Sequence, residues 1–232
     1  MTQFAKTSRN AQGNLIANDF EDVYFSPKNG LEETRHVFLK GNHLPSAWAN
    51  KEEFTIIETG FGTGLNFFAT IDLWEKTSKN HEKQQLHFIS TEMFPLKLET
   101  FKEALNNYPE LKKWRDIVAA HYPTLIQNQI NSVQLSKNIK LTLMIGDVMT
   151  TLPLCKNIAD AWYLDGFAPS RNPQMWNLEL YKQIFKLSHK GTTLATFTAA
   201  AHVRRGLAEA GFYIERIKGY AYKKHMTSGK IL

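Results

Sequence analysis

A glycine-rich turn next to an acidic residue is the clearest chemical motif of the sequence. Glu58 ends an apolar, β-branched run and is followed by Gly60, Gly62 and Gly64. Glycine permits a tight turn and the close approach of a ligand because it has no Cβ atom. The dinucleotide fingerprint G-x-G-x-x-G would need its third glycine at position 65, where the chain has Leu65. The pattern therefore favours a cofactor without a pyrophosphate, such as a sulfonium compound whose α-ammonium group Glu58 can pair with.

Acidic residues also follow two later apolar runs. Glu92 can accept both hydroxyl groups of a ribose, as an acid at the end of a second strand does in nucleotide-binding folds. It lies 32 positions after Gly60, and a polar loop at 77–85 accounts for this long spacing. Asp147 can accept from an adenine amino group or cap a helix, and the two roles are compatible. A solvated Glu92 without a ligand is the alternative.

The segment 163–173 reads YLDGFAPSRNP and is the most unusual in the chain. Pro169 and Pro173 hold it extended, and Phe167 supplies an aromatic wall. Methyl transfer to nitrogen requires an acceptor with a free lone pair held close to the methyl carbon. Asp165 can orient a primary amine and offset the positive charge that develops on it. We therefore predict Asp165 as the catalytic residue; the alternative is that it only caps its own turn.

Alternating strands and helices must position these residues. We expect strands at 54–58, 86–91, 139–146, 161–166, 192–198 and 212–217, and a last one near 221–224. We expect helices at 31–39, 65–75, 95–106, 114–122, 176–188 and 201–210, the last capped by Gly211. This alternation predicts a Rossmann-like α/β fold, with a mostly parallel central sheet and helices on both faces. Ligands bind beyond the carboxyl ends of such strands, which is where every motif above lies.

The first 50 residues have a different composition, rich in Asn, Gly and Pro, with short extended pieces such as 22–25. We expect residues 1–50 to form an N-terminal arm that packs on the catalytic domain and takes part in the active site or covers it. Residues 51–232 then form the catalytic domain. Their length fits one domain with a single core.

Composition and charge narrow the class of partner. The net charge is +6, and residues 200–232 hold seven Lys and Arg against two Glu. A basic face of this kind suits a polyanion, or is simply solvated. No apolar run approaches the roughly 20 residues of a membrane helix, and no signal peptide is evident at the start, so no membrane partner is expected. Cys155 is the only cysteine and the histidines show no ligand spacing, so we expect no metal and a reducing, cytoplasmic setting.

These motifs together resemble the methyltransferase domain of the MnmC/MnmD family, which modifies the wobble uridine of tRNA. The resemblance extends over nearly the whole chain. It rests on the segments DVYFS at 22–26, GLEETRHVF at 30–38, ETGFGTGLN at 58–66, LDGFAP at 164–169 with NP at 172–173 and MW at 175–176, ATFT at 195–198, VRRG at 203–206 and GF at 211–212. It implies the class I fold of S-adenosylmethionine-dependent methyltransferases.

The resemblance also implies a reaction, namely N-methylation of 5-aminomethyl-2-thiouridine at the tRNA wobble position to 5-methylaminomethyl-2-thiouridine, with Asp165 as the catalytic residue. The cofactor is S-adenosyl-L-methionine, and its implied contacts are Glu58, Gly60, Phe61, Gly62, Gly64, Asn66, Glu92 and Asp147. The residues expected to bind the substrate are Tyr24, Phe25, Glu33, Arg35, Phe167, Pro169, Arg204 and Arg205. Ordinary packing of the two aromatic residues of the arm, and idle arginines on an exposed helix, are the alternatives here.

Several questions stay open at this point. In many family members an FAD-dependent oxidase domain follows, so FAD is expected only if such a domain belongs to the full-length protein. The chain is then either a stand-alone enzyme or one part of a larger protein, and its oligomeric state is not predicted. The alternatives for function are a small-molecule amine N-methyltransferase of the same fold, a non-catalytic tRNA-binding module, and a nicotinamide-dependent oxidoreductase, which Leu65 disfavours.

Overall fold

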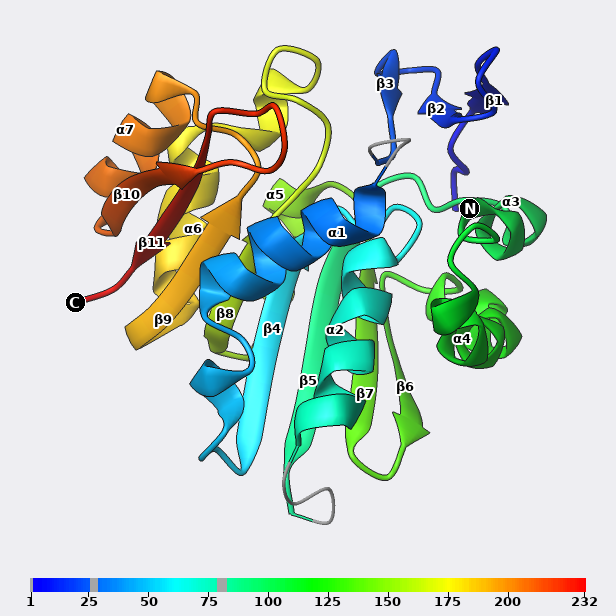
Figure 1. Cartoon of the computed structure of the whole chain (residues 1–232), viewed down its shortest axis with the longest axis horizontal. Helices are drawn as coiled ribbons and strands as arrows, with labels where there is room; N and C mark the ends of the chain where they lie inside the picture. Colours follow the sequence, from blue (N-terminus) through cyan, green and yellow to red (C-terminus); the bar gives the residue numbers. More distant parts are fainter. Residues whose placement is uncertain (1, 26–28, 79–82) are drawn as a thin grey trace.

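An eight-stranded sheet forms the centre of the computed structural model, which describes residues 2–25, 29–78 and 83–232 (Figure 1). The strand order is β10-β11-β9-β8-β4-β5-β7-β6. The strands are β4 (Glu53–Thr59), β5 (Gln85–Glu92), β6 (Ile130–Ser136), β7 (Ile139–Ile145), β8 (Ala159–Leu164), β9 (Ser188–Thr196), β10 (Tyr213–Lys218) and β11 (His225–Lys230). β9, β8, β4, β5 and β7 run parallel, and the remaining strands pair antiparallel. The predicted mostly parallel sheet is confirmed.

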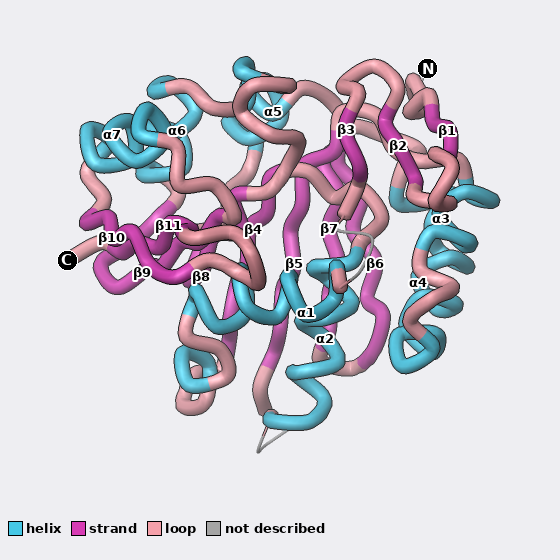
Figure 2. Tube along the Cα trace, turned by 45° about the horizontal axis from the view of Figure 1, so that its top comes forward, coloured by secondary structure: helices cyan, strands magenta, loops and turns pink. Residues whose placement is uncertain are grey.

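Helices cover both faces of the sheet, as Figures 1 and 2 show. One layer holds α1 (Gly30–Thr34), α2 (Leu65–Thr77), α3 (Leu98–Ala104) and α4 (Lys112–Leu125). The other holds α5 (Val148–Thr151), α6 (Leu178–Lys186) and α7 (Ala201–Ala210). α1 continues as a π-helical turn over Arg35–Leu39, so the helix expected at 31–39 is confirmed. Among the described residues, no helix has the length and apolar character needed to span a bilayer.

The central strands are apolar throughout because both of their faces are buried. Side chains alternate between the faces of a strand. Ile56 and Tyr163 pack in the core beneath α1 and α2, whereas Ile57 and Trp162 pack in the core beneath α6 and α7. All four are fully buried. The continuous apolar runs of the sequence therefore mark the strands that carry the site.

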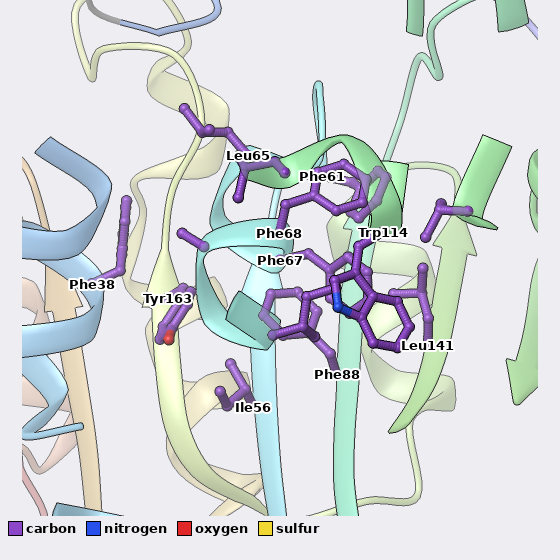
Figure 3. Close-up of a cluster of buried hydrophobic side chains, with 14 of the residues drawn as sticks. Phe38, Ile56, Phe61, Leu65, Phe67, Phe68, Phe88, Trp114, Leu141 and Tyr163 are labelled. Atoms are coloured by element: carbon purple, nitrogen blue, oxygen red, sulfur yellow. The ribbon is translucent and has the colours of Figure 1, made fainter. Parts of the chain in front are cut away.

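Aromatic rings fill much of the core on the α2 side (Figure 3). Phe88 of β5 meets Phe67 of α2 edge-on, with ring centroids 5.1 Å apart. Phe101 of α3 stacks on Tyr122 of α4 at 4.2 Å and an interplanar angle of 10°. Stacked and edge-on pairs add to the free energy that burial alone provides. They fix α2, which begins directly after the glycine turn.

The first 50 residues include a small sheet and the helix α1. β1 (Thr7–Arg9), β2 (Leu15–Ala17) and β3 (Asp22–Val23) make a small antiparallel sheet, which lies beyond the carboxyl ends of the central strands in Figure 1. Leu15, Leu31 and Trp48 join the same core cluster as β4 and α2. The boundary expected near residue 50 stays a prediction.

Other differences concern the edges of the sheet. The prediction of a strand near 221–224 is wrong. Residues 219–224 form a turn, in which the Gly219 amide donates to the Lys224 carbonyl at 3.2 Å. β6 was not predicted; its sequence INSVQLS is largely polar, and it pairs only with β7, at the edge. An edge strand with one covered face does not need a continuous apolar run.

The ends of the helices can also be compared with the predicted ranges. The helix expected at 95–106 is α3, which starts only at Leu98 because Lys97 is extended, with ψ 148°. Gly211 ends α7 with φ +119°, as predicted. The loop expected at 77–85 includes residues 79–82, which lie outside the described residues.

We expect Phe101→Ala to lower the free energy of unfolding by about 3–5 kcal/mol, because it removes a fully buried ring and leaves a cavity. Urea denaturation followed by circular dichroism measures this change. The control is Leu154→Ala, whose side chain is 46% exposed and which should change stability little. Equal effects of both substitutions would contradict the packing described here.

Candidate active site

The site forms where the chain order of the sheet reverses. From β4 the chain proceeds outward through β5 and β7, and then returns to place β8 on the other side of β4. The loops after β4 and β8 therefore meet. A Cβ atom on Gly60 would lie 3.4 Å from Cα of Gly166, and the Thr59 hydroxyl donates to the Asp165 carbonyl at 2.8 Å. This is the crevice in which such folds bind ligands.

A cavity of about 740 Å³ occupies this crevice. All four segments singled out in the sequence contribute to its wall, together with residues of the small sheet, α1 and the turn at 219–224. The wall includes these residues expected at the site: Tyr24, Phe25, Glu33, Gly60, Phe61, Gly62, Asn66, Glu92, Asp147, Asp165 and Phe167. The topology thus brings together most of the residues that the motifs suggested.

The glycine turn is built from left-handed backbone. Gly60, Gly62 and Gly64 have φ values of +85°, +53° and +75°, which other residues rarely adopt. A Cβ atom on Gly62 would lie 3.2 Å from the Tyr24 ring. Gly64 is the N-cap of α2 and contacts Phe61 rather than the cavity. The backbone of Gly60 and Gly62 therefore lines the crevice without side chains to fill it.

The next two acids lie at the same end of the sheet. Glu92 accepts from the amides of Gly62 at 2.7 Å and Phe94 at 2.8 Å, so its carboxylate joins the end of β5 to the glycine turn. Burial raises the pKa of Glu92, and the amide hydrogen bonds oppose that effect. Asp147 accepts from the Met149 amide at 2.7 Å and is the N-cap of α5. The expected capping role of Asp147 is confirmed, and the residue also lines the cavity.

One side-chain amide connects the two central carboxyl groups. Nδ2 of Asn66, in the first turn of α2, donates to Oε1 of Glu58 at 2.8 Å and to Oδ2 of Asp165 at 2.6 Å. Its Oδ1 accepts from the Thr34 hydroxyl at 2.9 Å, which fixes the orientation of the amide. The Ser90 hydroxyl donates to the second oxygen of Glu58 at 2.6 Å. The sequence placed Asn66 at the site, but nothing in the sequence indicated this bridging role.

The two acids differ in their access to the cavity. Glu58 is 1% exposed and sits behind Asn66, away from the cavity wall. Burial and the nearby charge of Asp165 raise the pKa of Glu58 well above its usual range. Asp165 faces the cavity, and burial raises its pKa to about 6. Asp165 also accepts from the Gly166 amide at 2.8 Å, so it caps its own turn and belongs to the cavity wall as well.

A charged pair forms another part of the wall. Nζ of Lys223 lies 2.6 Å from Oε1 of Glu33 and 5.4 Å from the centre of the Phe197 ring. Both charges act on Asp165, because Glu33 raises its pKa and Lys223 lowers it. Sequence reasoning placed a strand at Lys223 and missed this role. Its only sequence signal was membership of the basic C-terminal stretch.

Aromatic rings of the N-terminal region pack on the catalytic loop. Phe20 stacks on Phe167 with ring centroids 4.4 Å apart, and Tyr24 meets the same ring edge-on at 5.6 Å. Oδ2 of Asp22 accepts from the Ala168 amide at 3.1 Å. On the other side, Trp176 is buried and donates to the Phe167 carbonyl at 3.0 Å, so it packs beneath the catalytic loop. Sequence reasoning missed Phe20 and Asp22.

Several expected substrate contacts lie elsewhere. In the described part of the chain, the cavity wall does not include Arg35, Pro169, Arg204 or Arg205. Arg35 pairs with Glu32 and Asp72, and Nε of Arg204 donates to a backbone carbonyl at 3.2 Å. Their contacts with substrate stay predictions. Nowhere in residues 2–25, 29–78 and 83–232 do three or more His, Cys, Asp or Glu side chains gather as metal ligands.

The raised pKa of Asp165 predicts a pH-dependent stability. Its contribution to stability is complete below about pH 4, the pKa of an unfolded Asp, and is lost as the pH rises through about 6. We therefore expect Asp165→Asn to be as stable as the wild type near pH 4 and more stable at pH 7.

Urea unfolding between pH 4 and pH 7 measures this difference. Ser170→Ala, an exposed residue of the same loop that does not titrate, should differ from the wild type by a constant amount. A constant difference for Asp165→Asn as well would show that the carboxyl is not desolvated.

Comparisons with known proteins agree with this geometry. A family model for S-adenosyl-L-methionine-dependent methyltransferases matches residues 109–231. The tRNA 5-methylaminomethyl-2-thiouridine biosynthesis bifunctional protein MnmC of Methylobacillus flagellatus is 45% identical over 221 residues, and the protein of the same name from Aliivibrio fischeri is 43% identical over 231 residues. These alignments cover 94% and 96% of this chain, but 34% of each relative. The chain thus spans about a third of the length of these relatives.

Among solved structures, the crystal structure of MNMC2 from Aquifex aeolicus superposes with a TM-score of 0.80 at 20% identity, covering 99% of this chain and 71% of that chain. This likeness concerns the fold, and it confirms the expected class I architecture. The similarity to MnmC read from the motifs is confirmed by the curated relatives. The family model matches more than half of the residues of this chain, so the chain belongs to the S-adenosyl-L-methionine-dependent methyltransferases.

Proposed function

We propose that this chain methylates the aminomethyl nitrogen of 5-aminomethyl-2-thiouridine at the wobble position of tRNA. The observation that carries the proposal is the Asp165 carboxylate, which Asn66 holds at the wall of the cavity. An amine is the acceptor that such a group can orient. The names of the relatives, which refer to 5-methylaminomethyl-2-thiouridine in tRNA, identify the kind of amine.

The residues of the crevice fit the cofactor of the family. The glycine turn leaves space beside the backbone of Gly60 and Gly62, where ligand atoms can approach closely. Glu92 suits the ribose hydroxyls and Asp147 suits the adenine amino group, since both acids line the cavity. Glu58 is enclosed behind Asn66, so we propose that it supports this end of the site through the amide rather than by direct contact.

The chemistry of the acceptor follows from the state of Asp165. When bound, S-adenosyl-L-methionine supplies an activated methyl group. The carboxylate accepts a hydrogen bond from the amine, directs the nitrogen lone pair and stabilises the positive charge that develops there. The N–C bond forms as the bond between the methyl carbon and the sulfonium sulfur breaks, which leaves a neutral thioether, and the Asp165 carboxylate takes up the one proton that the amine loses. Because burial raises the pKa of Asp165 to about 6, the carboxylate is mostly ionised at neutral pH.

The aromatic wall suits the base that carries the amine. Phe20, Tyr24 and Phe167 form adjoining rings at the cavity, and bases stack on such rings. Phe25 also lies in the wall, whereas Ser26 of the same motif lies outside the described residues. Glu33 and its partner Lys223 form another part of the same wall.

The aminomethyl substrate must come from another reaction. The relatives are bifunctional and about three times as long as the aligned region. We propose that an FAD-dependent oxidase, as a second domain or a separate protein, removes a carboxymethyl group and produces the free amine. The reaction is expected in the cytoplasm, where tRNA is found.

The decisive assay is transfer of labelled methyl to tRNA from cells that lack this modification, followed by nucleoside analysis. We expect label in 5-methylaminomethyl-2-thiouridine. Asp165→Asn should lower kcat by about 100-fold or more, because the amide cannot accept a proton or offset the charge, while calorimetry should show cofactor binding intact.

The matched control is Asp116→Asn, an exposed residue of α4. Wild-type turnover in Asp165→Asn would remove the catalytic assignment. Absence of label with the wild-type protein, although it binds the cofactor, would remove tRNA as the substrate.

A second experiment concerns the cofactor. Glu92→Gln replaces an acceptor by an amide, which loses charge-assisted hydrogen bonds. We expect the Kd for S-adenosyl-L-methionine to rise about 10-fold or more in calorimetric titration. Glu99→Gln, an exposed residue of α3, is the matched control and should bind as the wild type does. Unchanged affinity in Glu92→Gln would place the ribose elsewhere.

A further inference from the structure

The turn between β10 and β11 is a well-defined structure at the edge of the cavity. Besides the hydrogen bond from Gly219 to Lys224, the Lys223 amide donates to the Tyr220 carbonyl at 2.9 Å. A Cβ atom on Gly219 would lie 2.3 Å from the Lys223 carbonyl oxygen, so only glycine fits there. We call residues 219–224 the rim loop.

Side chains on the two sides of the rim loop have different surroundings. Lys223 anchors the loop to α1 through Glu33 and lies over the Phe197 ring. The ring of Tyr220 packs near that of His36, with centroids 5.8 Å apart. Tyr222 also belongs to the cavity wall, yet it is 84% exposed. An anchored loop therefore holds one large aromatic ring in solvent at the mouth of the site.

The stretch of sequence that carries this ring is basic. From residue 216 to residue 232 the chain has five Lys and Arg and no Asp or Glu. Lys218, directly before the rim loop, and Lys224, its last residue, are exposed. Basic side chains bind phosphates and position a nucleic acid, whereas an aromatic ring stacks on any unpaired base. This combination favours single-stranded RNA over an apolar or cationic protein partner.

We infer that the rim loop binds the RNA strand next to the methylated nucleotide, with Tyr222 stacking on a neighbouring base and Lys218 and Lys224 contacting phosphates. The inference rests on the proposed function, since it takes a tRNA nucleotide as the occupant of the cavity. It divides recognition into two parts. The cavity holds the modified base, and the rim loop reads only that the adjoining base is unpaired.

The test compares Tyr222→Ala with Tyr222→Phe and with Tyr213→Ala. Tyr213, on β10, is also an exposed tyrosine, at 47%, and does not belong to the described cavity wall. Fluorescence anisotropy with an unmodified anticodon stem-loop measures the Kd, and the methyl-transfer assay gives KM and kcat for tRNA. We expect Tyr222→Ala to raise both Kd and KM about 10-fold with kcat unchanged. Tyr222→Phe and Tyr213→Ala should resemble the wild type.

The proposed contacts between lysine side chains and phosphates are tested by a separate measurement. Lys224→Gln should weaken binding of the stem-loop and reduce the slope of log Kd against log salt by about one. The outcomes separate the two proposals. Wild-type Kd in Tyr222→Ala overturns the rim-loop inference even if methyl transfer to tRNA is normal, and so does an equal loss in Tyr222→Phe or Tyr213→Ala. Stem-loop binding that depends on Tyr222 without methyl transfer by the wild type supports the loop and overturns the proposed function.

Discussion

The amide of Asn66, shared between Glu58 and Asp165, is the interaction on which the site depends. Two buried carboxyl groups so close together repel when both are ionised, and an NH₂ group is well suited to them because it offers one hydrogen to each. Its orientation is in turn fixed by Thr34 of α1. The electrostatics of the reaction centre thus require α1, α2, β4 and β8 to be in place together.

Residues of the N-terminal region contact the catalytic loop directly. Phe20 and Asp22 hold the catalytic loop through ring stacking and an amide hydrogen bond. On the opposite wall, Glu33 meets Lys223, a contact across 190 residues of sequence. The cavity therefore lies between segments from both ends of the described chain, and the parallel strands contribute only its floor.

The sequence predicted the parts of the site that obey local rules. Gly60 and Gly62 need left-handed backbone, and Asp165 follows a strand buried on both faces, so both motifs were recognisable. Lys223 was misread because Tyr and Lys residues in a short run suit a strand equally well, and only tertiary contacts reveal the turn. The contact of Glu58 with the cofactor stays a prediction; strand alternation places its side chain on the same side as Ile56, toward α2 and Asn66.

The position of β11 has a consequence for the order in which the protein assembles. β11 lies between β9 and β10, so β10 has no partner in the sheet until residues 225–230 are available. During synthesis from the N-terminus, the parallel strands can form first, whereas the turn that places Lys223 beside Glu33 joins β10 to β11 and is held by their pairing. The part of the cavity wall that Glu33 and Lys223 form is thus completed together with the sheet. A partly synthesised chain without β11 lacks this part of the wall.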